Sequence, residues 1–194
     1  MSKGISHKTK KLTLGAILAA MGVALLFVGS FIETLDLTMA ALASFFCIFA
    51  VIELGGAYPW LIFAVTGVLS VILMPYSLSG WFYLLFFGYY PILKEKFEHL
   101  SRPISWILKV VLLNVALIIC VLVAYFLFFG GSSEGNILSA FTLIFGESDA
   151  GEIMAIAVYA LVNVTFIIYD IALTKLITVY FIKIKPKFKG INLK

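Results

Sequence analysis

The chain has 194 residues, of which 63% are hydrophobic and 12% are charged, and its net charge is +4. Soluble domains contain about 45–50% apolar and about 25% charged residues, so a soluble globule of this composition would expose apolar surface over most of its exterior. The basic residues flank hydrophobic stretches, which favours contact with anionic lipid headgroups and argues against nucleic acid as a partner.

A membrane-spanning helix needs about 20 mostly apolar residues. The apolar stretches predict six such helices, in chain order at residues 12–32, 37–54, 58–74, 80–93, 104–129 and 153–182. The chain is therefore predicted to be an all-α, polytopic membrane protein that forms one domain over residues 1–194. Short basic tails are predicted at 1–11 and 183–194, and the longest loop at 130–152.

The distribution of charge predicts the orientation of these helices. When the six predicted helices cross the membrane in turn, all 14 Lys and Arg residues fall on one side of it. Positively charged loops remain in the cytoplasm. Both termini are therefore predicted to be cytoplasmic, in a multi-pass protein of a prokaryotic cell membrane. The first helix lacks a small-residue cleavage site and is interpreted as a retained helix.

The first predicted helix carries small residues at a spacing of four. Ala16, Ala20 and Ala24 form one row, and Gly15 and Ala19 form a second row beside it. In lipid, such rows let another helix approach closely, because packing drives helix association there. The row is either a docking face for another subunit or a packing face within the chain.

The last predicted helix carries a polar stripe that contains Tyr159, Asn163 and Asp170. Ionisable groups within a membrane are costly and usually face a cavity or a partner. The stripe is open to three interpretations: the wall of a ligand site, a proton or cation relay, or a structural hydrogen-bond network with Asn114 or Lys109.

Acidic and aromatic side chains are predicted at the outer ends of the helices, where no Lys or Arg falls. They include Glu33, Asp36, Trp81 and Tyr83. A cavity entrance lined by acidic and aromatic side chains admits a neutral or cationic small molecule more readily than an anion. The same acids are also the ordinary complement of positively charged inner loops. An apolar segment at 137–145 is either a lid or an interfacial half-helix.

Enzyme signatures are absent from the sequence. Both histidines, His7 and His99, lie in charged segments, and no His, Cys, Asp or Glu cluster has the spacing of metal ligands. The sequence also lacks G-x-S-x-G, H-E-x-x-H and the phosphate-binding G-x-x-x-x-G-K. We therefore expect no enzymatic activity, metal or cofactor, and active transport would need an ion gradient or a partner ATPase.

The opening TKKLTLGAILAA at residues 9–20, a basic run followed by an alanine row, resembles the substrate-binding S component of energy-coupling factor (ECF) transporters. The resemblance extends to the length and the predicted six-helix topology. It implies that Ala16, Ala20 and Ala24 dock on a transmembrane coupling subunit joined to two ATPases. It also implies an outward-facing substrate cavity that involves Tyr159, Asn163 and the 130–152 loop.

The function implied by this resemblance is the uptake of a small neutral or cationic nutrient, such as a vitamin, driven by the partner ATPases. Two alternatives remain open at this point. The chain could be a non-transporting scaffold or an accessory subunit of a membrane complex. It could also be a small secondary transporter that uses Asp170.

Overall fold

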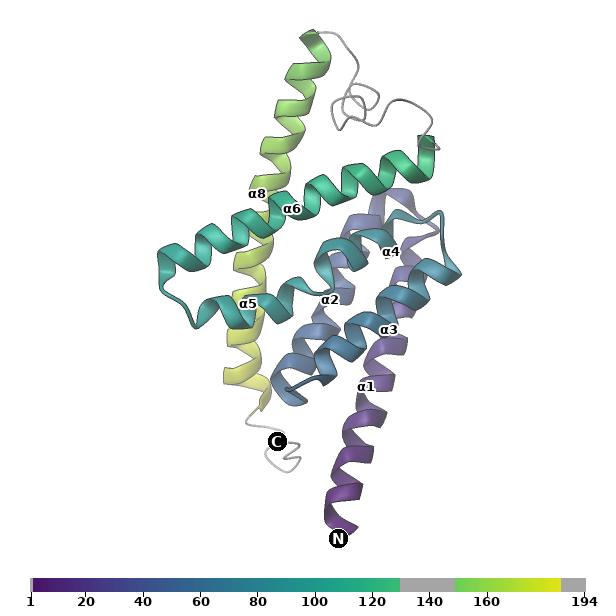
Figure 1. Ribbon diagram of the computed structural model, residues 1–194. Helices are drawn as coiled ribbons and strands as arrows, with labels where there is room; N and C mark the ends of the chain where they lie inside the picture. The colour runs from purple at the N-terminus through teal and green to yellow at the C-terminus, as the bar shows by residue number, and fades with distance from the viewer. Residues whose placement is uncertain (1, 130–148, 186–194) are drawn as a thin grey trace. The chain divides into compact units, whose positions relative to one another are not determined.

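The computed structural model describes residues 2–129 and 149–185 of the chain, and every element in these ranges is helical (Figure 1). The predicted all-α fold class is confirmed for this part of the chain. The helices divide into two compact units, the first extending to Val111 and the second beginning at Leu112. The elements of the first unit are α1 (Ser2–Gly29), η1 (Glu33–Leu35), α2 (Asp36–Glu53), α3 (Tyr58–Leu73), α4 (Leu78–Phe82), η2 (Tyr83–Phe87), α5 (Tyr90–Glu98) and the beginning of α6 (Arg102–Phe129).

Within the described ranges, four helical segments are long and apolar enough to cross a membrane. They are Lys8–Gly29 in α1, Asp36–Glu53, Arg102–Val123 in α6, and Ile156–Lys183. The shorter α3, Tyr58–Leu73, is apolar as well. These lengths and compositions are compatible with a membrane protein.

Three helices form the body of the first unit. α1, α2 and α3 pack against one another, and the N-terminal part of α1 extends past its two neighbours (Figure 1). α1 begins at Ser2, so most of the segment 1–11, predicted to be a basic tail, is part of the first helix. Gly55 and Gly56, at φ of 61° and 59°, make the turn between α2 and α3 in a left-handed conformation that glycine adopts at little cost.

The predicted fourth helix, residues 80–93, differs most from the structure. The segment consists of the short α4, the π-helical turn η2 and the separate helix α5. Pro91 lies in the first turn of α5, where its missing N–H is tolerated, whereas inside a continuous helix it would break the hydrogen-bond ladder. The π-helical turn η2 ends with a hydrogen bond of 2.8 Å from the Gly88 N–H to the Tyr83 carbonyl, five residues earlier.

The segment 94–103, which separates the predicted helices 80–93 and 104–129, is largely helical in the structure. α5 continues to Glu98 and α6 begins at Arg102, which leaves only residues 99–101 between them. Lys94 therefore lies on a helix, and its side chain is only 1% exposed. Glu98, four residues later on the same helix, forms an ion pair with it that is described below.

The second unit contains the later part of α6, the long helix α8 (Asp149–Val179) and the π-helical turn η3 (Tyr180–Ile184). α8 begins inside the predicted 130–152 loop. Most of that loop, with the apolar segment 137–145, and most of the predicted tail 183–194 lie outside the described residues.

Candidate functional site

The two small-residue rows of α1 have different environments in the structure. Gly15 and Ala19 are buried, and the Ala19 carbonyl accepts a hydrogen bond from the Thr66 hydroxyl of α3 at 3.4 Å. Ala16, Ala20 and Ala24 are exposed. The internal packing of α1 therefore uses the Gly15 row, and the alanine row presents a smooth surface on which another helix can pack closely.

The predicted outer residue Asp36 is the first residue of α2, and it is 6% exposed. The Ser77 hydroxyl donates to its carboxylate at 3.4 Å and lies 2.7 Å from the Ser79 hydroxyl. Ser79 in turn donates to the Leu26 carbonyl of α1 at 3.2 Å. This chain of hydroxyl groups joins α1, α2 and α4, and it gives the buried carboxylate polar neighbours.

The other predicted outer residues have separate surroundings. The Trp81 indole N–H donates to the Pro75 carbonyl at 3.0 Å, which fastens α4 to the turn before it. Tyr83 is buried, and its hydroxyl lies 3.1 Å from the Cys47 thiol in the core of the first unit. Glu33 lies in η1, and its side chain is outside the described part of the structure.

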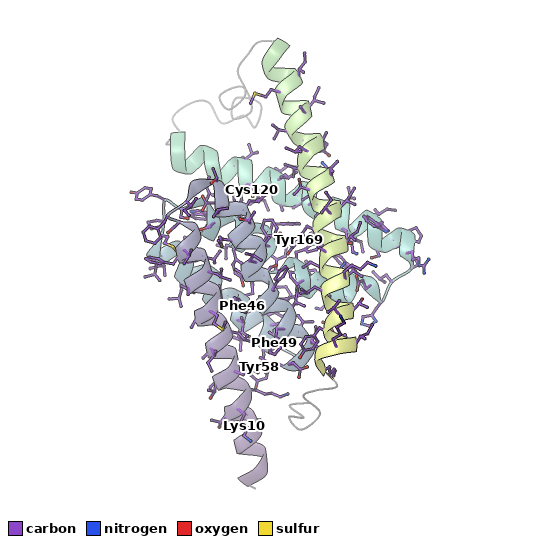
Figure 2. The ribbon with its side chains drawn as sticks, turned by 180° about the vertical axis from the view of Figure 1, so that it is seen from behind. Lys10, Phe46, Phe49, Tyr58, Cys120 and Tyr169 are labelled. Carbon is purple, nitrogen blue, oxygen red and sulfur yellow. The ribbon has the colours of Figure 1, made fainter. Side chains whose placement is uncertain are left out.

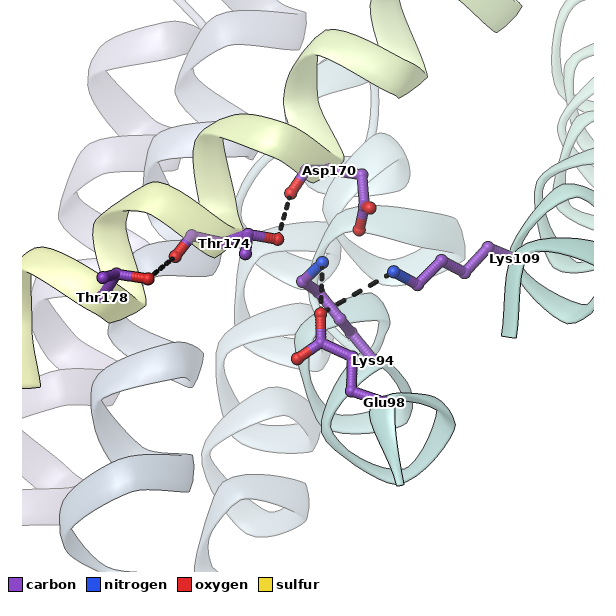
Figure 3. A network of polar contacts seen from close by, with 6 residues as sticks. All are labelled: Lys94, Glu98, Lys109, Asp170, Thr174 and Thr178. Carbon is purple, nitrogen blue, oxygen red and sulfur yellow. Dashed lines mark hydrogen bonds and ion pairs between the residues drawn. The ribbon is translucent and has the colours of Figure 1, made fainter. Parts of the chain in front are cut away.

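The polar stripe of α8 takes part in hydrogen bonds within the second unit. The Tyr159 hydroxyl donates to the Asn114 side-chain oxygen on α6 at 2.7 Å, and the Asn163 amide donates to the Tyr159 carbonyl at 2.8 Å. Asp170 is 3% exposed, and its backbone carbonyl accepts the Thr174 hydroxyl at 2.9 Å (Figure 3). One of the three interpretations of the stripe is a structural hydrogen-bond network with Asn114 or Lys109. The bond between Tyr159 and Asn114 is one bond of such a network.

We expect Tyr159→Phe to lower the melting temperature slightly, because it removes the hydrogen bond to Asn114 and keeps the ring. Hydrogen bonds between membrane helices contribute about 0.6 kcal/mol on average, which corresponds to about 1–3 °C for a chain of this size. Thermal unfolding of the detergent-solubilised protein measures the change. Tyr76→Phe is the matched control, because the Tyr76 side chain is 90% exposed. A fall for this control that equals or exceeds the fall for Tyr159→Phe would contradict the expectation.

A cluster of charges in the first unit was not predicted from the sequence. The Lys94 ammonium lies 2.8 Å from the Glu98 carboxylate on α5, and the Lys109 ammonium of α6 lies 3.7 Å from the same oxygen (Figure 3). Both lysines are buried, and Glu98 is 42% exposed. The spacing of four residues between Lys94 and Glu98 is the signal that could have revealed their pairing in a helix.

No protein-family model, curated protein or solved structure matches this chain. Among the residues that the structure describes, no group of three or more His, Cys, Asp and Glu side chains could hold a metal ion. The candidate sites therefore rest on the geometry of the chain itself.

Proposed function

We propose that the protein crosses the membrane six times, with both termini in the cytoplasm, and acts as the substrate-binding subunit of an ECF-type importer. Its charge distribution supports this orientation, because all 14 Lys and Arg residues fall on one side of the predicted threading. Four long apolar helical segments support the membrane location. The resemblance of residues 9–20 to S components supports the role in transport.

The exposed alanine row is the observation that carries this proposal. α1 uses Gly15 and Ala19 for its internal contacts, whereas Ala16, Ala20 and Ala24 are exposed. In a bilayer, an apolar side chain gains little free energy by exchanging contacts with lipid chains for contacts with a partner helix. Close approach of the two backbones therefore provides much of the attraction. We propose that a transmembrane coupling subunit, joined to two ATPases, packs on this row.

The substrate in this proposal is a small neutral or cationic nutrient, such as a vitamin. The predicted outer loops contain acids and no Lys or Arg, which disfavours anions. On α8, the candidate contacts are Tyr159, Asn163 and Asp170. In the first unit, the candidates that remain are Glu33, Asp36 and Trp81, because the Tyr83 hydroxyl is buried beside Cys47.

We expect Ala20→Leu to abolish docking on the coupling subunit, because the leucine side chain would hold the two helix backbones apart. The test is affinity purification of the tagged chain from its native host under mild extraction. The wild type should carry a membrane subunit and two ATPases, and the variant should carry at least tenfold less.

Ala64→Leu on α3 is the matched control, since Ala64 is also an exposed alanine of an apolar helix. It should retain the full amount of partner protein. Wild-type protein that purifies alone, or Ala20→Leu protein with undiminished partners, would contradict the proposal.

A second candidate function is a non-transporting scaffold of a membrane complex. This function is favoured because candidate substrate contacts already form hydrogen bonds within the chain. The Asp36 carboxylate accepts from the Ser77 hydroxyl, and the Asn163 amide donates to the Tyr159 carbonyl of its own helix. A thermal-shift screen with vitamins and other small metabolites separates the two functions. A ligand that raises the melting temperature supports the importer subunit, and silence across the panel supports the scaffold.

A further inference from the structure

An apolar groove of about 170 Å³ runs between α1 and α3. Its lining includes Leu12, Gly15 and Ala16 from α1, and Tyr58, Leu61 and Val65 from α3. The hollow exists because the small residues of α1 leave space between the larger side chains. An apolar cavity of about 150 Å³ stays dry and can hold a benzene ring, so this groove has room for several methylene groups.

Cationic side chains lie at one end of the groove. The Lys11 ammonium donates to the Leu54 carbonyl at 3.3 Å and lies 5.8 Å from the centre of the Tyr58 ring. Lys8 is exposed and precedes Leu12 by four residues, so it lies on the groove side of α1, about 6 Å further along the helix axis. Lys10, labelled on the N-terminal part of α1 in Figure 2, follows Lys8 by two residues, which places it about 200° around the helix from Lys8.

The two ends of the groove therefore differ in chemistry. At one end, the Lys11 ammonium lies near the ring of Tyr58, which lines the groove, and Lys8 is on the same side of α1. From there the groove continues along α1 and α3 between apolar side chains. An anionic phospholipid has the complementary arrangement, because its phosphate is followed directly by hydrocarbon chains. A lysine near an anionic lipid surface contributes about 1 kcal/mol of attraction.

We propose that this groove binds an anionic phospholipid, with one acyl chain between α1 and α3 and the phosphate beside Lys8 and Lys11. The inference depends on the membrane location in the proposed function; the groove shares Ala16 with the docking row, but lipid binding does not require docking. Ala20 and Ala24 do not line the groove, so a lipid bound there leaves most of the alanine row accessible. The groove would make this lipid a fixed component of the first unit.

The test is a lipid titration of the delipidated, detergent-solubilised full chain, followed by native mass spectrometry. Phosphatidylglycerol and phosphatidylcholine with the same acyl chains are the two probes. We expect one phosphatidylglycerol to bind at least fivefold more tightly than phosphatidylcholine. Lys8→Gln should weaken this binding about fivefold, which corresponds to one lysine at an anionic surface. Lys10→Gln, the matched exposed control, should leave the affinity unchanged.

A second pair of variants tests the acyl-chain end of the groove. Val65→Phe places a ring in the groove at a side chain that is 45% exposed, so the fold should tolerate it, and binding of the lipid should be lost. Val68→Phe lies one turn later on α3, outside the groove lining, and should bind as the wild type does. Circular dichroism of each variant checks that the helices are retained.

Three results would overturn the inference. These are equal affinity for the two lipids, an equal loss in Lys8→Gln and Lys10→Gln, or unchanged binding in Val65→Phe. The failure of the docking proposal would look different, because it is measured by the proteins that accompany Ala20→Leu. Lys8→Gln should keep those proteins if both proposals hold.

Discussion

Replacing Glu98 by glutamine is expected to lower the melting temperature by about 4–8 °C. The Glu98 carboxylate lies 2.8 Å from the ammonium group of Lys94, whose side chain is 1% exposed. Removal of one partner from a buried ion pair costs about 3–5 kcal/mol, because the other charge stays buried. Glu98 is 42% exposed, so water screens part of the interaction, and we expect a loss of about 2 kcal/mol.

Glu95→Gln is the matched control, because Glu95 lies on the same helix and is exposed. Thermal unfolding in detergent should give nearly the wild-type temperature for this control. In the double variant Lys94→Met with Glu98→Gln, the loss should be smaller than the sum of the two single losses, since each single variant already removes the interaction between Lys94 and Glu98. Equal effects of Glu98→Gln and Glu95→Gln would show that the pair does not stabilise the first unit.

Gly22→Ala is expected to destabilise the contact between α1 and α3. A Cβ atom at Gly22 would lie 2.9 Å from the Thr66 Cγ2 atom and 3.3 Å from its hydroxyl oxygen. Thr66 is buried and β-branched, so its side chain has few other rotamers, and its hydroxyl donates to the Ala19 carbonyl. Overpacking of this kind costs about 1–3 kcal/mol, against a gain in helix propensity of up to about 1 kcal/mol.

Gly15→Ala provides a close control for this effect. Gly15 lies seven residues earlier on the same face of α1, so both substitutions gain the same helix propensity. A Cβ at Gly15 would meet Ile62 at 3.6 Å, which is an ordinary van der Waals distance. We expect Gly15→Ala to melt at the wild-type temperature or above it, and Gly22→Ala to melt about 2–6 °C below it. The reverse order of the two melting temperatures would contradict the packing of Thr66 against α1.

The positions of most helices could be predicted from hydrophobicity and turn residues. The predicted stretch 37–54 corresponds to α2 at Asp36–Glu53, and 58–74 corresponds to α3 at Tyr58–Leu73. The stretch 80–93 was predicted less well. Its apolar composition is continuous, and composition does not reveal that a new helix begins at Tyr90 or that a π-helical turn ends at Phe87.

The candidate sites depended more strongly on tertiary contacts. Spacing along α1 identified the alanine row, but spacing did not distinguish it from the neighbouring Gly15 row, because both repeat at helical intervals. Only the packing of Thr66 beside Ala19 and Gly22 showed which row contacts α3. Likewise, the sequence placed Tyr83 among outer aromatic residues, whereas the structure buries its hydroxyl beside Cys47.

The sequence by itself determined the helical class of this protein, the approximate positions of its helices and the asymmetry of its charges, because these follow from local composition and from the cost of burying polar groups in lipid. Only the tertiary structure decided which faces of those helices meet. It brought Lys109 of α6 to Glu98 of α5, left Ala20 on the surface and formed the groove beside Val65. Those contacts depend on how separate helices approach each other, and side-chain volume at the crossing points determines that approach.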